Sequence, residues 1–224
     1  MVLDGHPGIL AVFTNCRDPR QEGDFNRWYH SSHVPRLEES GAVARSSRYR
    51  SVAEANSGQA KYLAIHESNW SDQASVYRDI TQTWDRLAAE GSIHPALELV
   101  LRAQYERVGQ EFRSDRSDRA VQGVLVVLTD PRPHVPDDEF NDWYANTHVP
   151  ELLGTGMYHT VNRYRLVASD PEAPRYAAIY ETELDAATAA NALLEYRGKW
   201  TQHPVHGVAY EVGLRGVFRA GPAL

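Results

Sequence analysis

The sequence has a single cysteine, Cys16, and no uninterrupted apolar segment long enough to cross a membrane. One cysteine excludes a disulfide within the chain and is typical of a reducing compartment, so we predict a cytoplasmic protein. A membrane-spanning helix needs about 20 apolar residues, so we expect no membrane partner. The first residues also lack the basic and apolar regions of a signal peptide.

Motifs that hold nucleotides or metals are absent too. There is no glycine-rich GxGxxG or GxxxxGK[ST] segment and no HExxH pair. His203 and His206 are separated by two residues, but no carboxylate or cysteine pattern accompanies them, so we predict no metal site. The net charge of −7 lacks the basic footprint that nucleic acid requires. We therefore expect no nucleic-acid partner and no cofactor.

What the sequence does contain is an internal repeat. Residues 24–29 match 139–144, and residues 33–35 match 148–150, at a constant offset of 115 positions. The same offset relates the Arg-Tyr-Arg segment at 48–50 to the Arg-Tyr-Arg segment at 163–165. Register held over so many positions indicates that the chain consists of two diverged copies of one unit.

Each copy predicts the order strand, helix, strand, strand, helix, strand. Short β-branched segments predict the strands, and apolar residues at helical spacing predict the helices. In the first copy the strands are expected at 9–14, 46–52, 62–67 and 97–108 and the second helix at 71–90; the first helix is expected to have Asp24 as N-cap and to end or kink near Val34. In the second copy the strands are expected at 124–128, 158–167, 176–181 and 209–218 and the second helix at 184–197; the first helix is expected to end or kink near Val149.

The βαββαβ order is that of the ferredoxin-like unit. One such unit leaves a sheet face uncovered, so we predict an α+β fold in which two tandem units pack their sheets into one barrel. Residues 111–120 are polar and charged and predict a linker. The expected domains are therefore residues 1–110 and 121–224, with 111–120 between them.

These features resemble the dimeric α+β barrel superfamily, and within it the EthD-like and stress-responsive barrel groups. The resemblance lies in the Phe-Asn-x-Trp-Tyr…His-Val-Pro helix, the Arg-Tyr pair on the next strand and the third strand. It implies a small barrel with an interior ligand pocket. It also implies one of several activities, including cofactor-independent oxygenation, isomerisation, cyclisation, dehydration and, in some branches, haem chemistry. Larger assemblies are common in this superfamily, so a homodimer is expected.

His33 and His148 are the first candidate catalytic residues. Imidazole is suited to proton transfer near neutral pH, although a structural histidine at the end of the helix explains the same pattern. The resemblance implies that this histidine faces the pocket. Tyr29 and Tyr144 lie four residues earlier on the same helix face and are expected to assist, with core packing as the alternative.

A second group of residues is predicted to bind the substrate. Arg48 and Arg163 alternate with a second arginine along a strand, and a guanidinium facing inward would hold a carboxylate or phenolate. On the third strand, the face with tyrosine and histidine is expected to line the interior, while the aliphatic face packs under the helices. The copies differ there, which slightly favours the first copy as the active one. The predicted binding residues are Arg48, Arg163, Tyr62, His66, Tyr176, Tyr180, Trp28 and Trp143.

From these residues we expect a cofactor-independent acid–base enzyme, a lyase, dehydratase or isomerase that acts on a small aromatic or polyketide-like molecule. If the enzyme is a lyase, cleavage of a carbon–carbon bond is one possible reaction. Two alternatives stay open. The first is a haem-binding barrel with His33 or His148 as the axial ligand, and the second is a ligand-binding or stress-response protein without catalysis.

Overall fold

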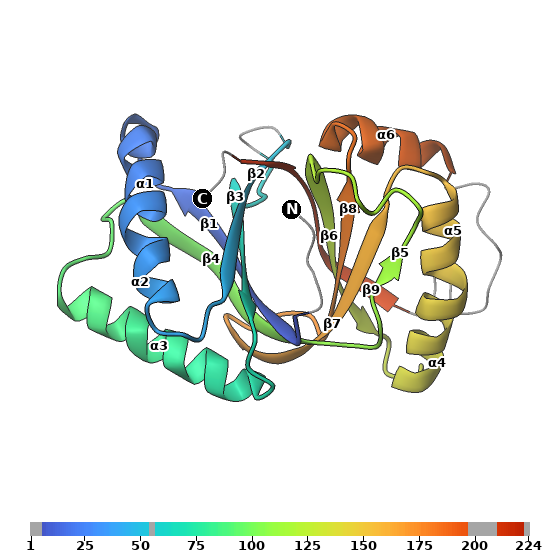
Figure 1. Cartoon of the computed structure of the whole chain (residues 1–224), viewed down its shortest axis with the longest axis horizontal. Helices are drawn as coiled ribbons and strands as arrows, with labels where there is room; N and C mark the ends of the chain where they lie inside the picture. The colour runs from blue at the N-terminus through green and yellow to red at the C-terminus, as the bar shows by residue number, and fades with distance from the viewer. Residues whose placement is uncertain (1–5, 54–56, 197–209, 222–224) are drawn as a thin grey trace. The chain divides into compact units, whose positions relative to one another are not determined.

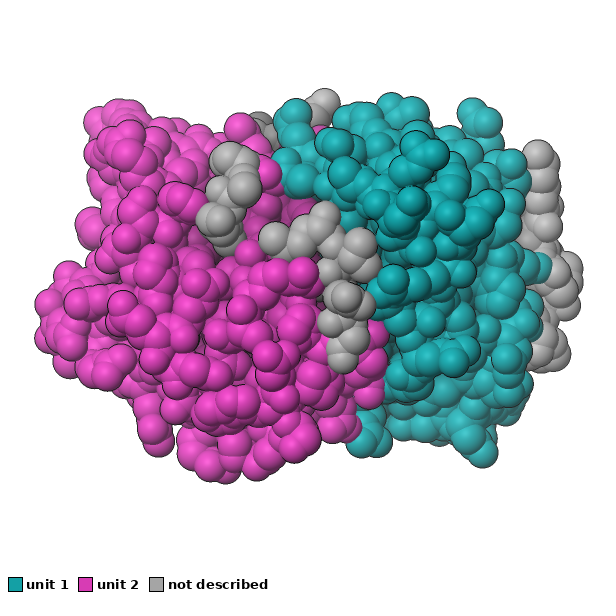
Figure 2. Space-filling model, viewed as in Figure 1, with its two compact units in different colours: residues 1–2, 108–165, 174–220 teal, residues 3–107, 166–173, 221–224 magenta. Residues whose placement is uncertain are grey.

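A computed structural model describes residues 6–53, 57–196 and 210–221 of the 224-residue chain. The chain divides into two compact units, which Figure 2 shows in different colours. The first-copy unit is built mainly on residues 3–107 with 166–173, and the second-copy unit on residues 108–165 and 174–220.

The first-copy unit has the predicted element order, and the observed bounds differ from the predicted ones by a few residues (Figure 1). A 3₁₀ turn precedes its first helix, and a π turn then interrupts that helix. The elements are β1 (Gly8–Cys16), η1 (Pro19–Gln21), α1 (Glu22–Trp28), η2 (Tyr29–His33), α2 (Val34–Glu38), β2 (Arg45–Ser51), β3 (Tyr62–Ser68), α3 (Gln73–Ala89) and β4 (Leu97–Arg107).

The second-copy unit repeats this order. Its elements are β6 (Gly123–Pro131), α4 (Asp137–Trp143), η3 (Tyr144–His148), α5 (Val149–Gly154), β7 (Thr160–Asp170), β8 (Tyr176–Thr182), α6 (Ala186–Tyr196) and β9 (Tyr210–Ala220). The predicted end of the last helix at residue 197 and the start of the last strand at residue 209 lie outside the described residues.

Within each unit the strands form an antiparallel sheet with the ferredoxin-like order. The order is β4-β1-β3-β2 in the first copy and β9-β6-β8-β7 in the second. The first strand of each copy carries a register shift against the closing strand, between Phe13 and Thr14 and between Leu128 and Thr129. The two shifts are again 115 residues apart, so the repeat extends to an irregularity of the backbone.

An aromatic core lies between the sheet and the helices of each unit. In the first copy Phe25 and Tyr29 pack with Tyr62 and Ala64 of β3. The face of β3 with tyrosine and histidine therefore lies under the helices, and the prediction that the aliphatic face does so was wrong. The reason is that the helix face is itself aromatic, and aromatic rings pack edge-to-face or tilted against one another.

The first helix of each copy, predicted to end or kink near Val34 or Val149, continues past its proline through a π turn. In the first copy Val34 donates its N–H to the carbonyl of Tyr29, five residues back, and α2 then continues. Val149 and Tyr144 form the same bond in the second copy. A proline has no N–H and crowds the preceding turn of an α-helix, so one wider π turn lets the helix continue past Pro35.

The start of the first helix also differs from the prediction. Asp18, rather than Asp24, acts as an N-cap, because its carboxylate accepts a hydrogen bond from the N–H of Arg20 at 3.0 Å and so begins the 3₁₀ turn η1. Helix α1 then begins at Glu22, two residues before Asp24.

A two-residue strand, β5 (Phe112–Arg113), lies within the segment that the sequence predicts as a linker. It pairs with β7 at Val161 and Thr160. No helix in the described parts of the chain combines the length and apolar character needed to cross a membrane.

Neighbouring leucines on α6 test the position of the second-copy core. Leu193 is buried against the sheet, whereas Leu194 is 45% exposed. We expect Leu193→Ala to lower the free energy of unfolding by about 2–5 kcal/mol, because it removes buried methyl groups and leaves a void. Leu194→Ala is the matched control and should change it by less than about 0.5 kcal/mol. Urea unfolding measures both, and equal losses would contradict this helix orientation.

Candidate functional site

The π turn brings a tyrosine and a histidine together in each copy. In η3 the rings of Tyr144 and His148 lie 4.9 Å apart between centroids, and in η2 the rings of Tyr29 and His33 lie 5.0 Å apart. π turns inside α-helices occur often at functional sites. The preceding tryptophan stacks on the imidazole in both copies, Trp143 at 5.0 Å and Trp28 at 4.9 Å. The tryptophans thus orient the histidines.

A cavity of about 350 Å³ lies in the second-copy unit. This volume is typical of a small-molecule site. Strand β6 contributes alternate residues, and β9, paired beside β6, contributes three more. The π turn and α5 contribute Tyr144, His148 and Leu152. The remaining lining residues are Leu125, Val127, Thr129, Tyr180, Leu193, Tyr210, Val212 and Arg215. Apolar side chains therefore surround one imidazole, one guanidinium and three phenols.

Two tyrosines in the cavity wall hydrogen-bond each other. The hydroxyls of Tyr144 and Tyr180 form a short contact, and both side chains are buried. Burial raises the pKa of Tyr144 to about 12 and raises that of Tyr180 well above its usual value. Both phenols are therefore protonated at neutral pH, so this pair offers hydrogen-bond donors rather than a base.

Arg163 lies behind this pair. Its guanidinium carbon is 3.9 Å from the centre of the Tyr144 ring, and its side chain is only 2% exposed. The arginine is not among the residues that line the cavity. Burial lowers the pKa of Arg163, yet a guanidinium stays charged because its ordinary pKa is above 12. Arg163 thus places a positive charge beneath the phenol pair.

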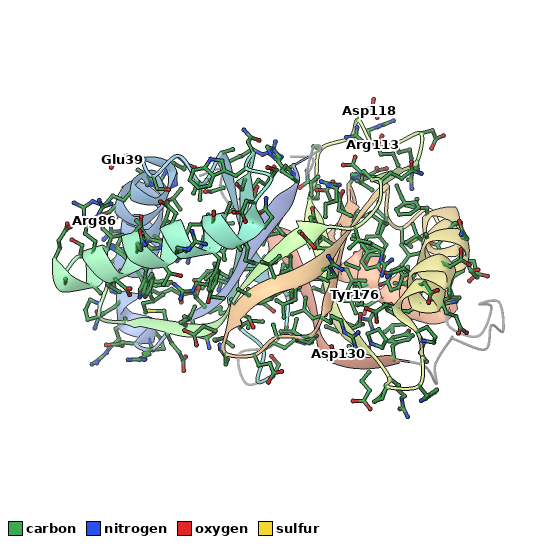
Figure 3. All side chains as sticks on the ribbon, turned by 90° about the horizontal axis from the view of Figure 1, so that it is seen from below. Glu39, Arg86, Arg113, Asp118, Asp130 and Tyr176 are labelled. Carbon is green, nitrogen blue, oxygen red and sulfur yellow. The ribbon has the colours of Figure 1, made fainter. Side chains whose placement is uncertain are left out.

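Tyr176, labelled in Figure 3, is also outside the cavity lining. Its hydroxyl donates to Asp137 at 2.9 Å and accepts from the side-chain amide of Asn141 at 3.1 Å. Tyr62 makes the equivalent bonds with Glu22 and Asn26 in the first copy. Both tyrosines therefore fasten the first helix to the third strand.

The first-copy residues form a packed cluster instead of an open site. His33 is 5% exposed, with Trp28 stacked on one side and Trp84 of α3 edge-on at 5.8 Å. The Arg48 guanidinium lies 3.7 Å from the centre of the Tyr29 ring. Because the bulky Trp84 covers His33, the imidazole does not border open space as His148 does.

His66 stands where the second copy has Tyr180. Its Nδ1 lies 2.9 Å from the hydroxyl of Ser46, and its side chain is 1% exposed. Burial, together with the positive charge of Arg48, lowers the pKa of His66 to about 3 and that of His33 to about 4. Both imidazoles are therefore neutral near pH 7.

The structure thus separates the predicted residues into two groups. His148, Tyr144 and Tyr180 meet at the second-copy cavity, with Trp143 and Arg163 supporting them. Tyr29, His33 and His66 lie in the first-copy cluster. The sequence slightly favours the first copy, but the cavity lies in the second.

Sequence reasoning missed three polar residues of the cavity: Thr129, Tyr210 and Arg215. Arg215 faces Val127 across the β6–β9 pair. Alternation along these strands was a usable signal, since Leu125, Val127 and Thr129 all line the cavity. The pairing register, which the sequence does not contain, was needed to join the two strands.

In the described part of the chain, no group of three or more histidine, cysteine, aspartate or glutamate side chains is placed to hold a metal ion. His203 and His206 lie outside the described residues.

Comparison with solved structures shows the fold. A DypB variant of Rhodococcus jostii in complex with heme has a TM-score of 0.64 at 8% identity, over 98% of this chain and 94% of that one. A chlorite dismutase mutant of Candidatus Nitrospira defluvii in complex with cyanide has a TM-score of 0.62 at 12% identity, over 98% of this chain and 93% of that one. An anthrone oxidase-like protein has a TM-score of 0.55 at 13% identity, over 98% of this chain and 92% of that one. The predicted α+β barrel class, with ferredoxin-like units, is confirmed.

Sequence comparison gives less. No family model matches the chain. Core atranone cluster protein 1 of Stachybotrys chlorohalonatus is 32% identical over 65 residues, which span 29% of this chain and only 27% of that protein.

The prediction of a cofactor-independent lyase, dehydratase or isomerase was wrong. The fold is that of a protein solved with heme and of a chlorite dismutase, and these findings favour the haem alternative.

The buried His33 predicts a pH dependence of stability. Its pKa is about 4 in the folded chain against about 6.5 when unfolded, so between these values only the unfolded chain takes up the proton. Stability should therefore fall as the pH drops from about 6.5 to 4, with a share of up to about 3 kcal/mol from His33. Unfolding free energies of His33→Gln should fall less steeply over this range. His30→Gln, on the exposed side of the same turn, is the control, and identical profiles for all three proteins would contradict the assignment.

Proposed function

We propose that the second-copy cavity binds haem and that the chain is a haem-dependent α+β barrel enzyme. The observation that carries this proposal is His148, a half-buried imidazole in the wall of an otherwise mainly apolar cavity. The proteins of similar fold support it, since one is solved with heme and another is a chlorite dismutase.

The side chains that line the cavity are of the kinds that bind haem. A histidine imidazole is a common axial ligand of haem iron, and His148 is the imidazole that lines this cavity. Arg215, on the β9 wall, would pair with a propionate. The leucine and valine side chains suit the apolar macrocycle. The first copy fits poorly, because Trp28 and Trp84 enclose His33.

When bound, haem would supply one-electron and oxygen chemistry. The chain's own residues define the surroundings of that chemistry. Trp143 stacks on His148 and fixes the plane of its ring. The phenols of Tyr144 and Tyr180 keep their protons. One proton lies in the hydrogen bond between the two hydroxyls, and the other is left to donate to a polar group of a substrate. Leu125, Val127 and Leu152 exclude water from the walls.

Visible spectroscopy of the purified protein with added ferric haem tests this proposal. We expect the Soret band of free haem to shift and to saturate at about one haem per chain. His148→Ala should lose the shifted band, and added imidazole should restore it. His33→Gln is the matched control, because its histidine belongs to the same motif but lies outside the cavity, and it should bind like wild type. An unshifted band, or equal spectra for wild type and His148→Ala, would refute the haem site.

A small aromatic molecule is a second candidate occupant, as substrate or as ligand. Two observations favour it: three tyrosines line the cavity, and an anthrone oxidase-like protein shares the fold. Anthrone is therefore a suitable probe, and its binding should quench tyrosine and tryptophan fluorescence at saturation. Leu193→Trp should weaken this binding at least tenfold, because the larger side chain occupies the cavity. Leu194→Trp, on the exposed side of α6, is the control. Equal binding by both variants would place anthrone elsewhere.

The repeat supports a further proposal about descent. The chain is a tandem fusion of two EthD-like units, with domains at 1–110 and 121–224 joined by residues 111–120. The matching π turns and matching register shifts support this. A homodimer and a cytoplasmic location complete the proposal, the latter on the single cysteine.

A further inference from the structure

The first-copy cluster holds four buried polar atoms that no described residue hydrogen-bonds. They are Oη of Tyr29, Nδ1 of His33, one terminal nitrogen (Nη2) of Arg48 and Nε2 of His66. Buried polar atoms almost always have a partner, so several unpartnered ones together indicate an occupant that belongs among them.

These groups come from three elements and lie close together. The Arg48 guanidinium lies over the Tyr29 ring, and the Tyr29 ring contacts that of His33. Arg48 pairs with Ala64 in the β2–β3 ladder, and Ala64 lies two residues before His66 on the same face of β3. The π turn, β2 and β3 therefore bring one cation, two imidazoles and a phenol to the same region.

The charge of this region is positive and lacks a described counter-ion. Besides Tyr29, the rings of Tyr62 and Phe25 lie 4.5 and 5.2 Å from the Arg48 guanidinium. The nearby carboxylates have other partners. Glu67, next to His66 on β3, forms ion pairs with Arg45 and His6, and Glu22 pairs with Lys61. Aromatic faces stabilise a buried cation in part, but a buried charge ordinarily needs an opposite charge and hydrogen bonds.

We propose that the first-copy cluster is a binding site for a small planar monoanion, of the size of formate or nitrate, held by Arg48, Tyr29, His33 and His66. A guanidinium matches two oxygens of such an anion. The phenol of Tyr29 donates, and each neutral imidazole donates from whichever nitrogen carries its proton. Because the groups are buried, the site admits only a small anion and excludes bulky ones.

The second copy does not reproduce this donor set. Tyr180 stands in place of His66, and its hydroxyl forms a hydrogen bond with the hydroxyl of Tyr144. His148 borders the cavity instead of being enclosed. The anion site is therefore specific to the first copy, and it does not depend on haem in the second.

Thermal unfolding of the haem-free protein tests the proposal, with sodium nitrate and sodium formate as probes and sodium sulfate of equal ionic strength as the reference. An anion that binds only the folded chain raises the unfolding midpoint as its concentration rises. We expect this for wild type with nitrate and formate, beyond the effect of sulfate. Histidine NMR signals of His33 and His66 should shift with the same concentration dependence.

Three variants locate the effect. Arg48→Gln should abolish it, and Tyr29→Phe, which keeps the ring, should weaken binding roughly tenfold or more by removing one hydrogen bond to a charge. His66→Tyr introduces the second-copy residue and should also abolish it. Arg50→Gln, exposed on the same strand, should respond like wild type.

Two results would overturn the proposal. If nitrate and formate act no more strongly than sulfate on wild type, water rather than an anion satisfies the four atoms. If Tyr29→Phe, His66→Tyr and Arg50→Gln all respond like wild type, the anion binds elsewhere. The readout needs no haem, so failure of the haem proposal leaves this test unchanged.

Discussion

In both copies a guanidinium, half-buried at Arg48 and buried at Arg163, lies over the tyrosine ring of the π turn. Arg48 covers Tyr29 and Arg163 covers Tyr144, at 3.7 and 3.9 Å. This contact joins the second strand to the first helix and places the tyrosine and the following histidine against the sheet. Its energy is modest for each pair, but the charge is buried, so the groups around it must provide hydrogen bonds or a counter-ion. The polar chemistry of each copy therefore develops around this arginine.

The copies meet that requirement in different ways. In the second copy Tyr180 binds the hydroxyl of Tyr144, and a cavity opens beside His148. In the first copy His66 leaves the hydroxyl of Tyr29 unpartnered among the described residues. The last helices differ as well, since Trp84 of α3 covers His33 whereas α6 presents small residues such as Ala189. The two copies share one framework, and different side chains at a few positions give one an enclosed polar cluster and the other an open cavity.

The π turn explains why these residues occur together in one short motif. A proline after the histidine removes a helical hydrogen-bond donor, and the wider turn accommodates it. The turn rotates the histidine relative to a regular α-helix and stacks it on the tryptophan of the preceding turn. The Trp-Tyr…His-Val-Pro motif is therefore a structural unit first, and its histidine acquires a further role only where the neighbouring elements leave space.

The sequence by itself determined the internal repeat, the βαββαβ order and the positions of nearly every strand, because these depend on local periodicity and on identities repeated at a fixed offset. It also identified Tyr144, His148 and Tyr180, which meet at the cavity, although it missed Tyr210 and Arg215. It did not determine that the helix continues through Pro35, because a π turn has no distinct apolar pattern. Nor did it determine which copy holds the cavity. That choice depends on the volumes of side chains such as Trp84 and Leu193, which are distant in sequence from the motif and meet it only through packing, so only the tertiary structure decided it.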